Sequence, residues 1–419
     1  MPYTHEELDF LFAHPEAIEF ASTLELSRKS ELREIAGLRK DYGDKARCLV
    51  ELVQSRRTAQ RKIEGGSQWM VDSPSAQQAT PSPVADFRAQ HLKGLGVERV
   101  ADVTCSVGTE LMHLSRAGIS AVGADLDFQR LRMARANVPN VPVLRADALH
   151  PVIDAPVVIA DPARRGSSGR IHSIKDLMPP LPELIAAQQG RELAVKCAPG
   201  IDFSNVDDWA GQVDIVSVDG DVKEACVYTP GLRAQAGGVG LKEGGQEGSG
   251  LLRRAVVMRA SGLLTLTSAM PYEEDDAKAA APAGRYLFDP DGAIVRAGLV
   301  RHLAAQHGWW QLDPRIAYLT GDTLPGEQGT EAVDPAEAVR AAGARAFEIV
   351  EQVPLKKLKA ALHARSAARV EILVRGVDVD PDQLRKKLKL KAGKGKQNSW
   401  SVVIARIGDA ATAFICESV

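Results

Sequence analysis

Cysteine is scarce in this sequence, and no two cysteines have the spacing of a metal site. The 419 residues include five cysteines, and none of them forms a Cys-x-x-Cys pair. This arrangement argues against a zinc site and against a disulfide framework, so we predict no metal. The sequence also lacks any run of about eighteen apolar residues, and we therefore expect no membrane-spanning helix.

An excess of charge of either sign is missing as well. The formal net charge is -2 at pH 7, so any signal for binding nucleic acid or membrane must be local. The start of the chain, Met1-Pro2-Tyr3-Thr4-His5, has neither the basic residues nor the apolar core of a signal peptide. Hydrophobic residues make up 45% of the chain, which is ample for real cores, and the length predicts two or three domains. We predict a globular, cytoplasmic protein.

One pattern organises the first half of the chain: an apolar run that ends in aspartate. It occurs four times, at residues 100–102, 121–125, 141–147 and 157–161. Apolar runs of this length are typical of buried parallel strands. Because the carboxyl ends of parallel strands meet at one edge of the sheet, where doubly wound folds bind ligands, the four acids predict a pocket there. A pocket lined by acids suits a hydroxyl-rich, cationic ligand.

The spacing within this pattern favours a nucleoside ligand. Asp125 lies 23 residues after Asp102, about where such folds place the carboxylate that binds a ribose hydroxyl. Three glycines at Gly-x-Gly-x-x-Gly spacing are absent, which disfavours a dinucleotide. Further along, Asp219-Gly220-Asp221 separates two apolar stretches and predicts a β-hairpin.

The turn Asp102-Val103-Thr104-Cys105-Ser106-Val107-Gly108 carries a family resemblance. It is similar to the Asp-x-x-Cys-Gly-x-Gly turn of guanine-N2 RNA methyltransferases, and it departs from that turn at Ser106, where the family has glycine. Residues from about 77 to 229 resemble class I S-adenosylmethionine-dependent methyltransferases as a whole. The resemblance implies an α/β fold with a Rossmann-like seven-stranded sheet that ends in an antiparallel hairpin, and S-adenosylmethionine as the cofactor.

The resemblance also implies a cofactor site. Asp102 and Gly108 would shape its methionine side, Asp125 would bind the ribose, and Asp147 with Ala148 would bind the adenine. The full set of implied cofactor-binding residues is Asp102, Cys105, Gly108, Asp125, Leu126, Asp147 and Ala148.

The segment Asp161-Pro162-Ala163-Arg164 occupies the catalytic position of the family. Amino methyltransferases place Asp/Asn-Pro-Pro-Tyr/Phe there: the acid or amide and the first proline carbonyl accept hydrogen bonds from the target amine, and the ring stacks on the base. The first two residues fit this motif, and an arginine plane can stack on a base in place of the ring. We therefore predict Asp161, Pro162 and Arg164 as catalytic residues, the alternative for Arg164 being an ion pair at the pocket rim.

The same segment also resembles a second motif. Asp161-Pro162-Ala163-Arg164-Arg165-Gly166 matches the Asp-Pro-Pro/Ala-Arg-x-Gly motif of RNA uracil-5-methyltransferases, in which a cysteine at the end of the fifth strand attacks uracil C6. Cys197 lies at that position. The Ser-Cys-Asn-Pro surround of that family is replaced here by Lys196-Cys197-Ala198-Pro199, and a lone cysteine that ends a buried strand is most often a small core residue.

The regions before the first strand predict helices. Short apolar periodicities before residue 77 indicate a helical N-terminal region. Its cluster of Arg56, Arg57, Arg61 and Lys62 could contact phosphate or could be a solvated helix face. Thr80, followed by Pro81, predicts the N-cap of the next helix. His113, on the helix after the first turn, could accept a proton or be structural.

The last 130 residues or so resemble the THUMP-like domain found behind some bacterial methyltransferases, with Val374-Arg375-Gly376-Val377-Asp378 near its middle. THUMP domains present RNA to fused enzymes, so the resemblance implies RNA, with tRNA or rRNA expected. Residues 354–396 contain 13 lysines and arginines against 4 acids, a local charge of +9. Such a balance is typical of a phosphate-binding surface, and a solubilising basic helix is the alternative.

Four regions follow from these patterns: a helical N-terminal region at 1–76, a methyltransferase domain at 77–265, a linker and helical connector at 266–344, and a THUMP-like α+β domain at 345–419. We predict an enzyme that uses S-adenosylmethionine to methylate an RNA base at an exocyclic amine such as guanine N2. The alternatives are a uracil-5-methyltransferase that uses Cys197 as nucleophile, a non-catalytic RNA-binding protein on this fold, and a methyltransferase for a small molecule.

Overall fold

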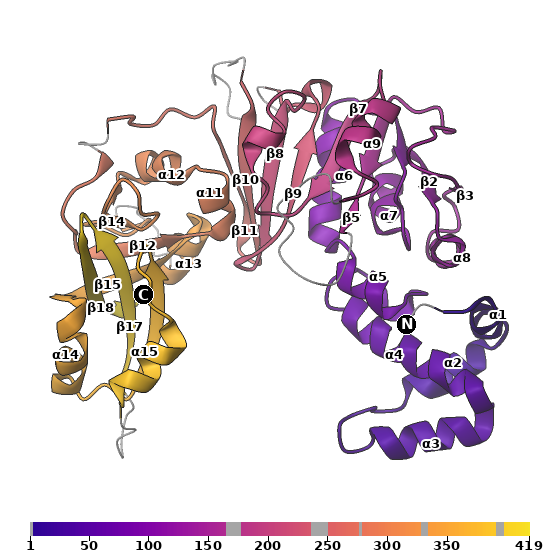
Figure 1. The fold of residues 1–419 in the computed structure, drawn as a ribbon, viewed down its shortest axis with the longest axis horizontal. Coiled ribbons are helices and arrows are strands. Elements are labelled where there is room, and N and C mark those ends of the chain that lie inside the picture. The colour runs from indigo at the N-terminus through magenta and orange to yellow at the C-terminus, as the bar shows by residue number, and fades with distance from the viewer. Residues whose placement is uncertain (1–2, 165–176, 236–249, 276–278, 328–333, 391–397) are drawn as a thin grey trace. The chain divides into compact units, whose positions relative to one another are not determined.

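The computed structural model describes residues 3–164, 177–235, 250–275, 279–327, 334–390 and 398–419. The chain forms two compact units (Figure 1). The first contains Met1–Cys197, Asp202–Gly211 and Cys226–Val239, and the second contains Ala198–Ile201, Gln212–Ala225 and Gly240–Val419. Within the described ranges, no helix is both long and apolar enough to cross a lipid bilayer.

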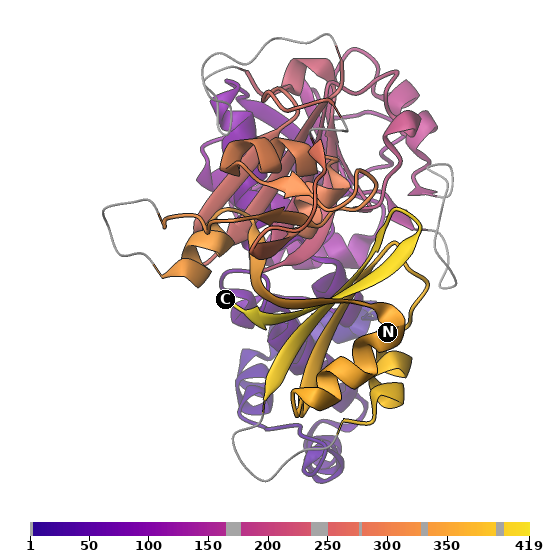
Figure 2. The same ribbon diagram turned by 90° about the vertical axis from the view of Figure 1, so that its left-hand side faces the viewer.

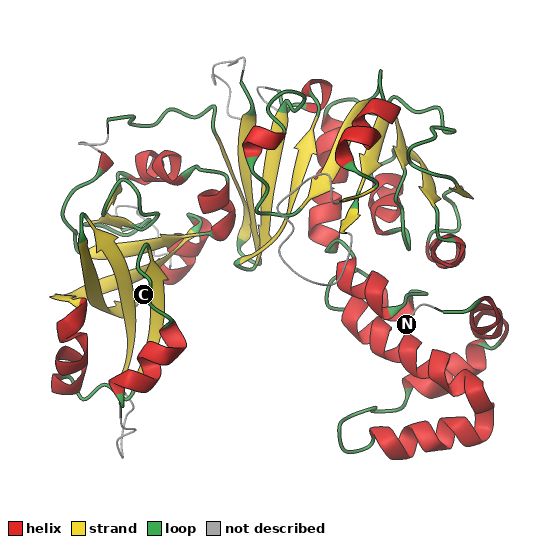
Figure 3. Ribbon diagram, in the orientation of Figure 1, coloured by secondary structure: helices red, strands yellow, loops and turns green. Residues whose placement is uncertain are grey.

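The predicted N-terminal helices are present (Figure 3). Thr4 begins the first of them with a capping box, in which its side chain accepts the Glu7 amide while the Glu7 carboxylate accepts the Thr4 amide. Leu49 and Leu52 lie at the centre of an apolar cluster that these helices share. The helices are α1 (His5–Ala13), α2 (Pro15–Ser22), α3 (Glu31–Tyr42), α4 (Ala46–Ala59) and α5 (Ser73–Gln78).

The main sheet has nine strands in the order β11-β10-β8-β9-β7-β4-β1-β2-β3. The seven strands from β3 to β8 form the predicted methyltransferase sheet, and two further strands extend it: β10, parallel to β8, and β11, antiparallel to β10. Its strands are β1 (Arg99–Asp102), β2 (Ser120–Asp125), β3 (Val143–Arg145), β4 (Val157–Ala160), β7 (Glu192–Cys197), β8 (Gln212–Val218), β9 (Asp221–Tyr228), β10 (Leu252–Arg259) and β11 (Gly262–Thr267). A separate pair, β5 (Ala163–Arg164) and β6 (Leu177–Met178), follows β4.

The apolar strands of this sheet are buried on both faces because their side chains alternate. Val157 and Ile159 of β4 belong to the apolar cluster on one face, whereas Val158 and Ala160 belong to the cluster on the other. The first cluster includes residues of α6 (Ser82–Gly94) and α7 (Thr109–Arg116), and the second includes residues of α9 (Leu181–Ala187). Helix α8 (Phe128–Asn137) follows β2. This layering explains why the strands read as continuous apolar runs.

The C-terminal sheet has seven strands in the order β13-β14-β12-β15-β18-β17-β16 (Figure 2). The chain after residue 345 contains both strands and helices, and its sheet continues through three strands from the region expected to be a linker and helical connector. Residues 286–288 are buried, and as a strand they pair with the edge of β15. The strands are β12 (Tyr286–Pro290), β13 (Trp310–Gln311), β14 (Leu319–Gly321), β15 (Ala344–Pro354), β16 (Arg369–Arg375), β17 (Ser399–Ile407) and β18 (Ala410–Ser418). The helices are α11 (Gly292–Arg296), α12 (Val300–His307), α13 (Pro335–Ala341), α14 (Leu358–Ala364) and α15 (Pro381–Leu388).

Gly123 in β2 allows the turn after β1 to pack directly on the sheet. A Cβ atom at this position would lie 2.5 Å from Leu111 Cδ1 and 2.9 Å from Cys105 Sγ. We expect Gly123→Ala to lower the free energy of unfolding by about 1–3 kcal/mol because the core has no room for the methyl group. Denaturant unfolding measures this change. The control is Gly94→Ala, where a Cβ meets nothing within 4 Å; an equal loss in both variants would contradict the packing argument.

Candidate active site

The four aspartates predicted at strand ends lie at the carboxyl ends of four neighbouring strands. Asp102 and Asp125 are the last residues of β1 and β2, Asp161 directly follows β4, and Asp147 lies two residues after β3. Strands β1, β2, β3 and β4 are parallel neighbours. The structure therefore places all four aspartates along one edge of the main sheet.

The turn after β1 is built around two residues with positive φ. Gly108 has φ +94°, and a Cβ atom there would lie 3.0 Å from Val138 Cγ2. Ser106 has φ +50°, a left-handed conformation that costs a side-chain-bearing residue about 1–2 kcal/mol. Its amide donates to Asp125 Oδ2 at 3.0 Å, and the Asp127 amide donates to Asp125 Oδ1 at 2.9 Å. The strained turn thus holds the Asp125 carboxylate in a fixed orientation.

The residues after Asp125 and after β3 supply an apolar surface and further polar groups. Leu126 is 56% exposed although it is a large apolar residue. Asp147 accepts a hydrogen bond from the Leu149 amide. Ala148 is buried, and its carbonyl oxygen accepts a hydrogen bond from Gln188 Nε2 at 2.7 Å. An exposed leucine beside oriented carboxylates is a suitable surface for a planar base linked to a diol.

Asp102 is a buried acid. It is 2% exposed and accepts one hydrogen bond, from the Thr104 amide at 3.2 Å. Burial, reinforced by the negative charge of Glu110, raises the pKa of Asp102 to about 8, although Lys196 acts in the opposite direction. At neutral pH this carboxyl is therefore mostly protonated.

Lys196, near the end of β7, connects the predicted catalytic acid to a buried ion pair. Its ammonium donates to Asp161 Oδ2 at 2.5 Å and to Thr80 Oγ1 at 2.5 Å, and it lies 3.8 Å from Glu110 Oε1. Glu110 is itself paired with the buried Arg88 at 2.5 Å. The sequence analysis did not select Lys196, Glu110 or Arg88. The only signal for Lys196 was a lysine inside an otherwise apolar strand.

The predicted N-cap role of Thr80 is wrong. Helix α6 begins at Ser82, its N-cap position is Pro81, and it has no side-chain cap. A proline at the cap has no hydroxyl to offer the helix amides, and the hydroxyl of Thr80 instead accepts a hydrogen bond from Lys196.

Asp161 and Pro162 begin a segment at the open edge of the sheet. The Asp161 amide donates to Thr104 Oγ1 at 2.6 Å, its side chain is 46% exposed, and Pro162 is buried. The backbone of Arg164 lies in β5, whereas its side chain lies outside what the structure describes, as do Arg165 and Gly166.

Cys197, the last residue of β7, is partly buried. Burial, together with the nearby Cys226 and Asp161, raises the pKa of its thiol well above the usual range.

His113 is buried on α7, and burial lowers the pKa of its imidazole. Among the described residues, neither of its ring nitrogens has a hydrogen-bond partner. In these environments neither the Cys197 thiol nor the His113 imidazole is suited to acid–base catalysis at neutral pH.

The basic N-terminal cluster is mostly structural. Arg56 donates to the carbonyl oxygens of residues 68 and 69, Arg57 to those of residues 24 and 25, and Lys62 to those of residues 76 and 77.

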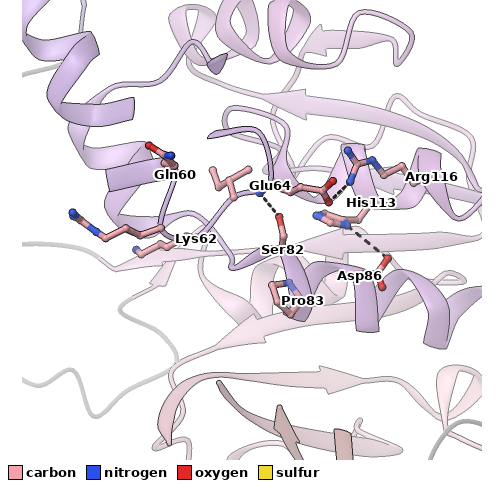
Figure 4. Close-up of a pocket in the computed structure, with 10 residues that line it drawn as sticks. Gln60, Lys62, Glu64, Ser82, Pro83, Asp86, His113 and Arg116 are labelled. Carbon is pink, nitrogen blue, oxygen red and sulfur yellow. Dashed lines mark hydrogen bonds and ion pairs between the residues drawn. The ribbon is translucent and has the colours of Figure 1, made fainter. Parts of the chain in front are cut away.

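Arg61 is exposed and lines a surface pocket of about 510 Å³ (Figure 4). The Arg116–Glu64 ion pair also lies in it, and His113 Nδ1 lies 3.8 Å from Asp86 Oδ1. The pocket is lined by Gln60, Arg61, Lys62, Ile63, Glu64, Ser82, Pro83, Asp86, His113 and Arg116.

The strand order of the main sheet, with its carboxyl-edge acids and its β8–β9 hairpin, defines a methyltransferase-like α/β fold. The chain belongs to the S-adenosylmethionine-dependent methyltransferases. It is 40% identical over 397 residues to an uncharacterized S-adenosylmethionine-dependent methyltransferase of Mycobacterium tuberculosis, and the alignment covers 90% of this chain and 99% of that protein. The same values hold for the corresponding protein of a second strain of that organism.

Two further comparisons concern the fold and the tail. A proposed methyltransferase from Porphyromonas gingivalis W83, known from its crystal structure, is 16% identical with a TM-score of 0.69, and 99% of each chain is covered. This likeness shows that the whole fold is shared. Residues 344–418 match the THUMP domain-like family. The predicted methyltransferase fold, its cofactor class and its THUMP-like tail are thereby confirmed.

The residues at the carboxyl edge fit S-adenosylmethionine. The close approach at Gly108 leaves a bare backbone beside the turn, the Asp125 carboxylate is oriented by two amides, and Leu126 is exposed beside it. The described residues contain no group of three or more His, Cys, Asp and Glu side chains that could hold a metal ion.

Asp102 should make stability depend on pH. The pKa of Asp102 in the folded protein is about 8, above its ordinary value of 3.8, so between these values the folded state holds a proton that the unfolded state releases. Rising pH from about 4 to about 8 therefore favours unfolding. Asp102→Asn cannot ionise, and we expect its stability relative to the wild type to increase through this window.

Urea unfolding of both proteins without cofactor, at pH 5.5 and at pH 8.5, measures this difference. A difference that stays constant or shrinks toward pH 8.5 would contradict the ionisation assigned to Asp102.

Proposed function

We propose that this protein transfers the methyl group of S-adenosylmethionine to an exocyclic amine of an RNA base, such as N2 of guanine. The observation that supports this proposal best is the state of Asp161. Its carboxylate is partly exposed at the carboxyl edge, one of its oxygens is bonded to Lys196, and Pro162 follows it. An acid held in this way can accept a hydrogen bond from an amine and orient its lone pair.

The cofactor would be held by residues of three strand ends. Asp102, Cys105 and Gly108 would surround its methionine part, Asp125 would bind the ribose hydroxyls, and the adenine would lie against residues of the next turns. We assign the adenine contacts to Leu126, Asp147 and Ala148. When bound, S-adenosylmethionine supplies an electrophilic methyl group on a sulfonium.

The chain's own residues would position the amine. The Asp161 carboxylate would accept a hydrogen bond from one N–H of the target and the Pro162 carbonyl from another, which would leave the nitrogen lone pair free for the methyl group that bound S-adenosylmethionine would supply. The methylated nitrogen would carry positive charge until it lost a proton to solvent. The Asp161 carboxylate stabilises that charge. Arg164 is assigned to stacking on the base.

Cys197 supports the amine target over uracil C5. Attack on uracil C6 requires a thiolate. The burial that raises the pKa of the Cys197 thiol, in company with Asp161, disfavours the thiolate at neutral pH. A carbon target is therefore the weaker of the two candidates.

RNA is proposed as the substrate because of the THUMP-like segment and its charge. Helices α14 and α15 pack on one face of the C-terminal sheet, in a single apolar cluster, and His363 Nε2 of α14 hydrogen-bonds the Leu388 carbonyl at the end of α15. Their exposed lysines therefore belong to one layer. These lysines are Lys359 of α14 and Lys386 and Lys387 of α15, with Lys356 and Lys357 in the turn before α14 and Lys389 directly after α15; Lys391, Lys394 and Lys396 lie outside the described residues.

The basic layer predicts salt-dependent RNA binding. Replacing Lys386 and Lys387 with serine should weaken RNA affinity. It should also reduce the magnitude of the slope of log K against log salt by roughly 1–2, because each phosphate contact contributes about 0.7–0.9 to that slope. Filter binding at several salt concentrations measures both quantities. The control replaces Arg39 and Lys40, exposed at the end of α3, with serine. An equal effect of both pairs would count against a phosphate surface on α15.

The choice of target atom can be tested at Asp161 and Cys197. Mass spectrometry of nucleosides from cells lacking the protein identifies the missing methylated base. For an exocyclic amine, Asp161→Ala should lower kcat by about 100-fold or more through misplacement of the amine, while Cys197→Ser should keep most activity.

A covalent adduct between the wild-type protein and 5-fluorouridine-containing RNA that disappears in Cys197→Ser would instead establish the uracil mechanism. Absence of any methylated product from the wild-type protein would favour a non-catalytic RNA-binding role.

A further inference from the structure

We infer that Lys196 is a positioning residue for the methyl transfer: its ammonium binds one oxygen of Asp161 and thereby directs the other oxygen toward the target amine. This inference rests on the proposed function, since it assigns the orientation of the acid that the proposal places against the substrate. Nothing in the motif Asp-Pro-Ala-Arg itself requires a lysine at this place.

Because Lys196 is buried, its ammonium depends on the polar groups around it. Its side chain is 7% exposed, and a buried ammonium is costly unless it is paired and hydrogen-bonded. Its partners come from different parts of the chain: Asp161 after β4, Thr80 before α6, and Glu110 in the first turn of α7. Because these elements fix the ammonium from several sides, it has little freedom to follow a mobile carboxylate. The carboxylate has to adapt to the lysine.

Asp161 is held at two points as a result. Its backbone amide is bonded to Thr104 Oγ1, and its Oδ2 atom is bonded to Lys196. For Oδ1, no hydrogen-bond partner exists among the residues that the structure describes. With 46% of the side chain exposed, this second oxygen is the one available to a ligand. The lysine thus selects which oxygen meets the amine.

The charges around Asp161 give Lys196 a second effect. Asp161 lies in a group of three acids, with Asp102 and Glu110, and the cations of this group are Arg88 and Lys196. Arg88 is bonded to Glu110, whereas Lys196 is bonded to Asp161. Lys196 therefore neutralises the charge of Asp161 as Arg88 neutralises that of Glu110.

The test uses Lys196→Met, which keeps the length of the side chain and removes the charge. The probe is bulk RNA from cells lacking the protein, with radiolabelled S-adenosylmethionine. We expect kcat to fall about 10–100-fold, while KM for the cofactor changes less than about 3-fold. Lys93→Met is the control, because it makes the same change at an exposed lysine of α6 that hydrogen-bonds the Gly118 carbonyl, and it should stay within about 3-fold of the wild type.

A second substitution separates positioning from mere structural support. An asparagine at position 161 presents a neutral amide oxygen that needs no counter-ion, so Asp161→Asn introduced into Lys196→Met should recover about 10-fold of the lost activity. A lysine that only supports the fold would give no such rescue. Equal kcat in the wild type and Lys196→Met, or a double variant no more active than Lys196→Met, would overturn the inference.

Thermal unfolding without cofactor gives a readout independent of activity. If the two side chains act as a pair, the losses in Tm of Lys196→Met and Asp161→Asn should not add in the double variant, and additive losses would contradict the pairing. Should Lys196→Met fail to fold, Lys196→Gln, which can still hydrogen-bond to Thr80, serves for the same comparisons. Absence of methyl incorporation by the wild type would overturn the proposed function, and the unfolding cycle would still decide whether the pair is coupled.

Discussion

A buried charge has to be paired or neutralised, and the carboxyl edge of the main sheet is organised by this constraint. Asp102 and Glu110 are both buried there, and the two acids satisfy this constraint in different ways. Glu110 stays charged because Arg88 and Lys196 hold its pKa below the ordinary value. Asp102, with one amide as hydrogen-bond donor, has a raised pKa and is mostly protonated. The pairing of Glu110 and the protonation of Asp102 therefore keep the net charge of this buried group small.

Hydrogen bonds also join the carboxyl edge of the main sheet to the N-terminal helices. Thr80 lies between α5 and α6, and its bond to Lys196 fixes the path of this segment over the end of β7. Asn137, at the end of α8, hydrogen-bonds both the amide and the carbonyl of Met70 and also the Val107 carbonyl in the turn after β1. The apolar cluster of the N-terminal helices includes Val107 and Met133. The N-terminal region is thus packed against the turn after β1 and contributes to its rigidity.

The sequence predicted the parts of this structure that local pattern determines. The apolar runs at 100–102 and 157–160 became strands, because their residues are buried on both faces of the sheet and no other local pattern competes. Lys196 could not be predicted as a site residue, since its partner Thr80 lies 116 positions away and the charge of one lysine reveals no partner. Thr80 was misassigned for a related reason. A threonine directly before a proline is typical of a helix N-cap, and only the tertiary contact with Lys196 decides otherwise. The strands between residues 286 and 321 were missed because their pairing is not local: β12 pairs with β15 and β14, and β13 pairs with β14.

The alternation of side chains along β7 bears on the chemistry at its end. Val195 and Cys197 both pack in the apolar cluster on the α9 face, whereas Ala194 packs in the cluster on the α6–α7 face. Lys196 accordingly points to the α6–α7 face, where Glu110 and Thr80 meet it. Two consecutive residues of a strand cannot both face the same side, so the register that brings the ammonium to Asp161 turns the thiol toward the apolar layer. A shift by one residue would reverse the two, exposing the cysteine to the acids and burying the lysine among leucines. The register therefore favours chemistry through Asp161 and Lys196 at this edge over chemistry through Cys197.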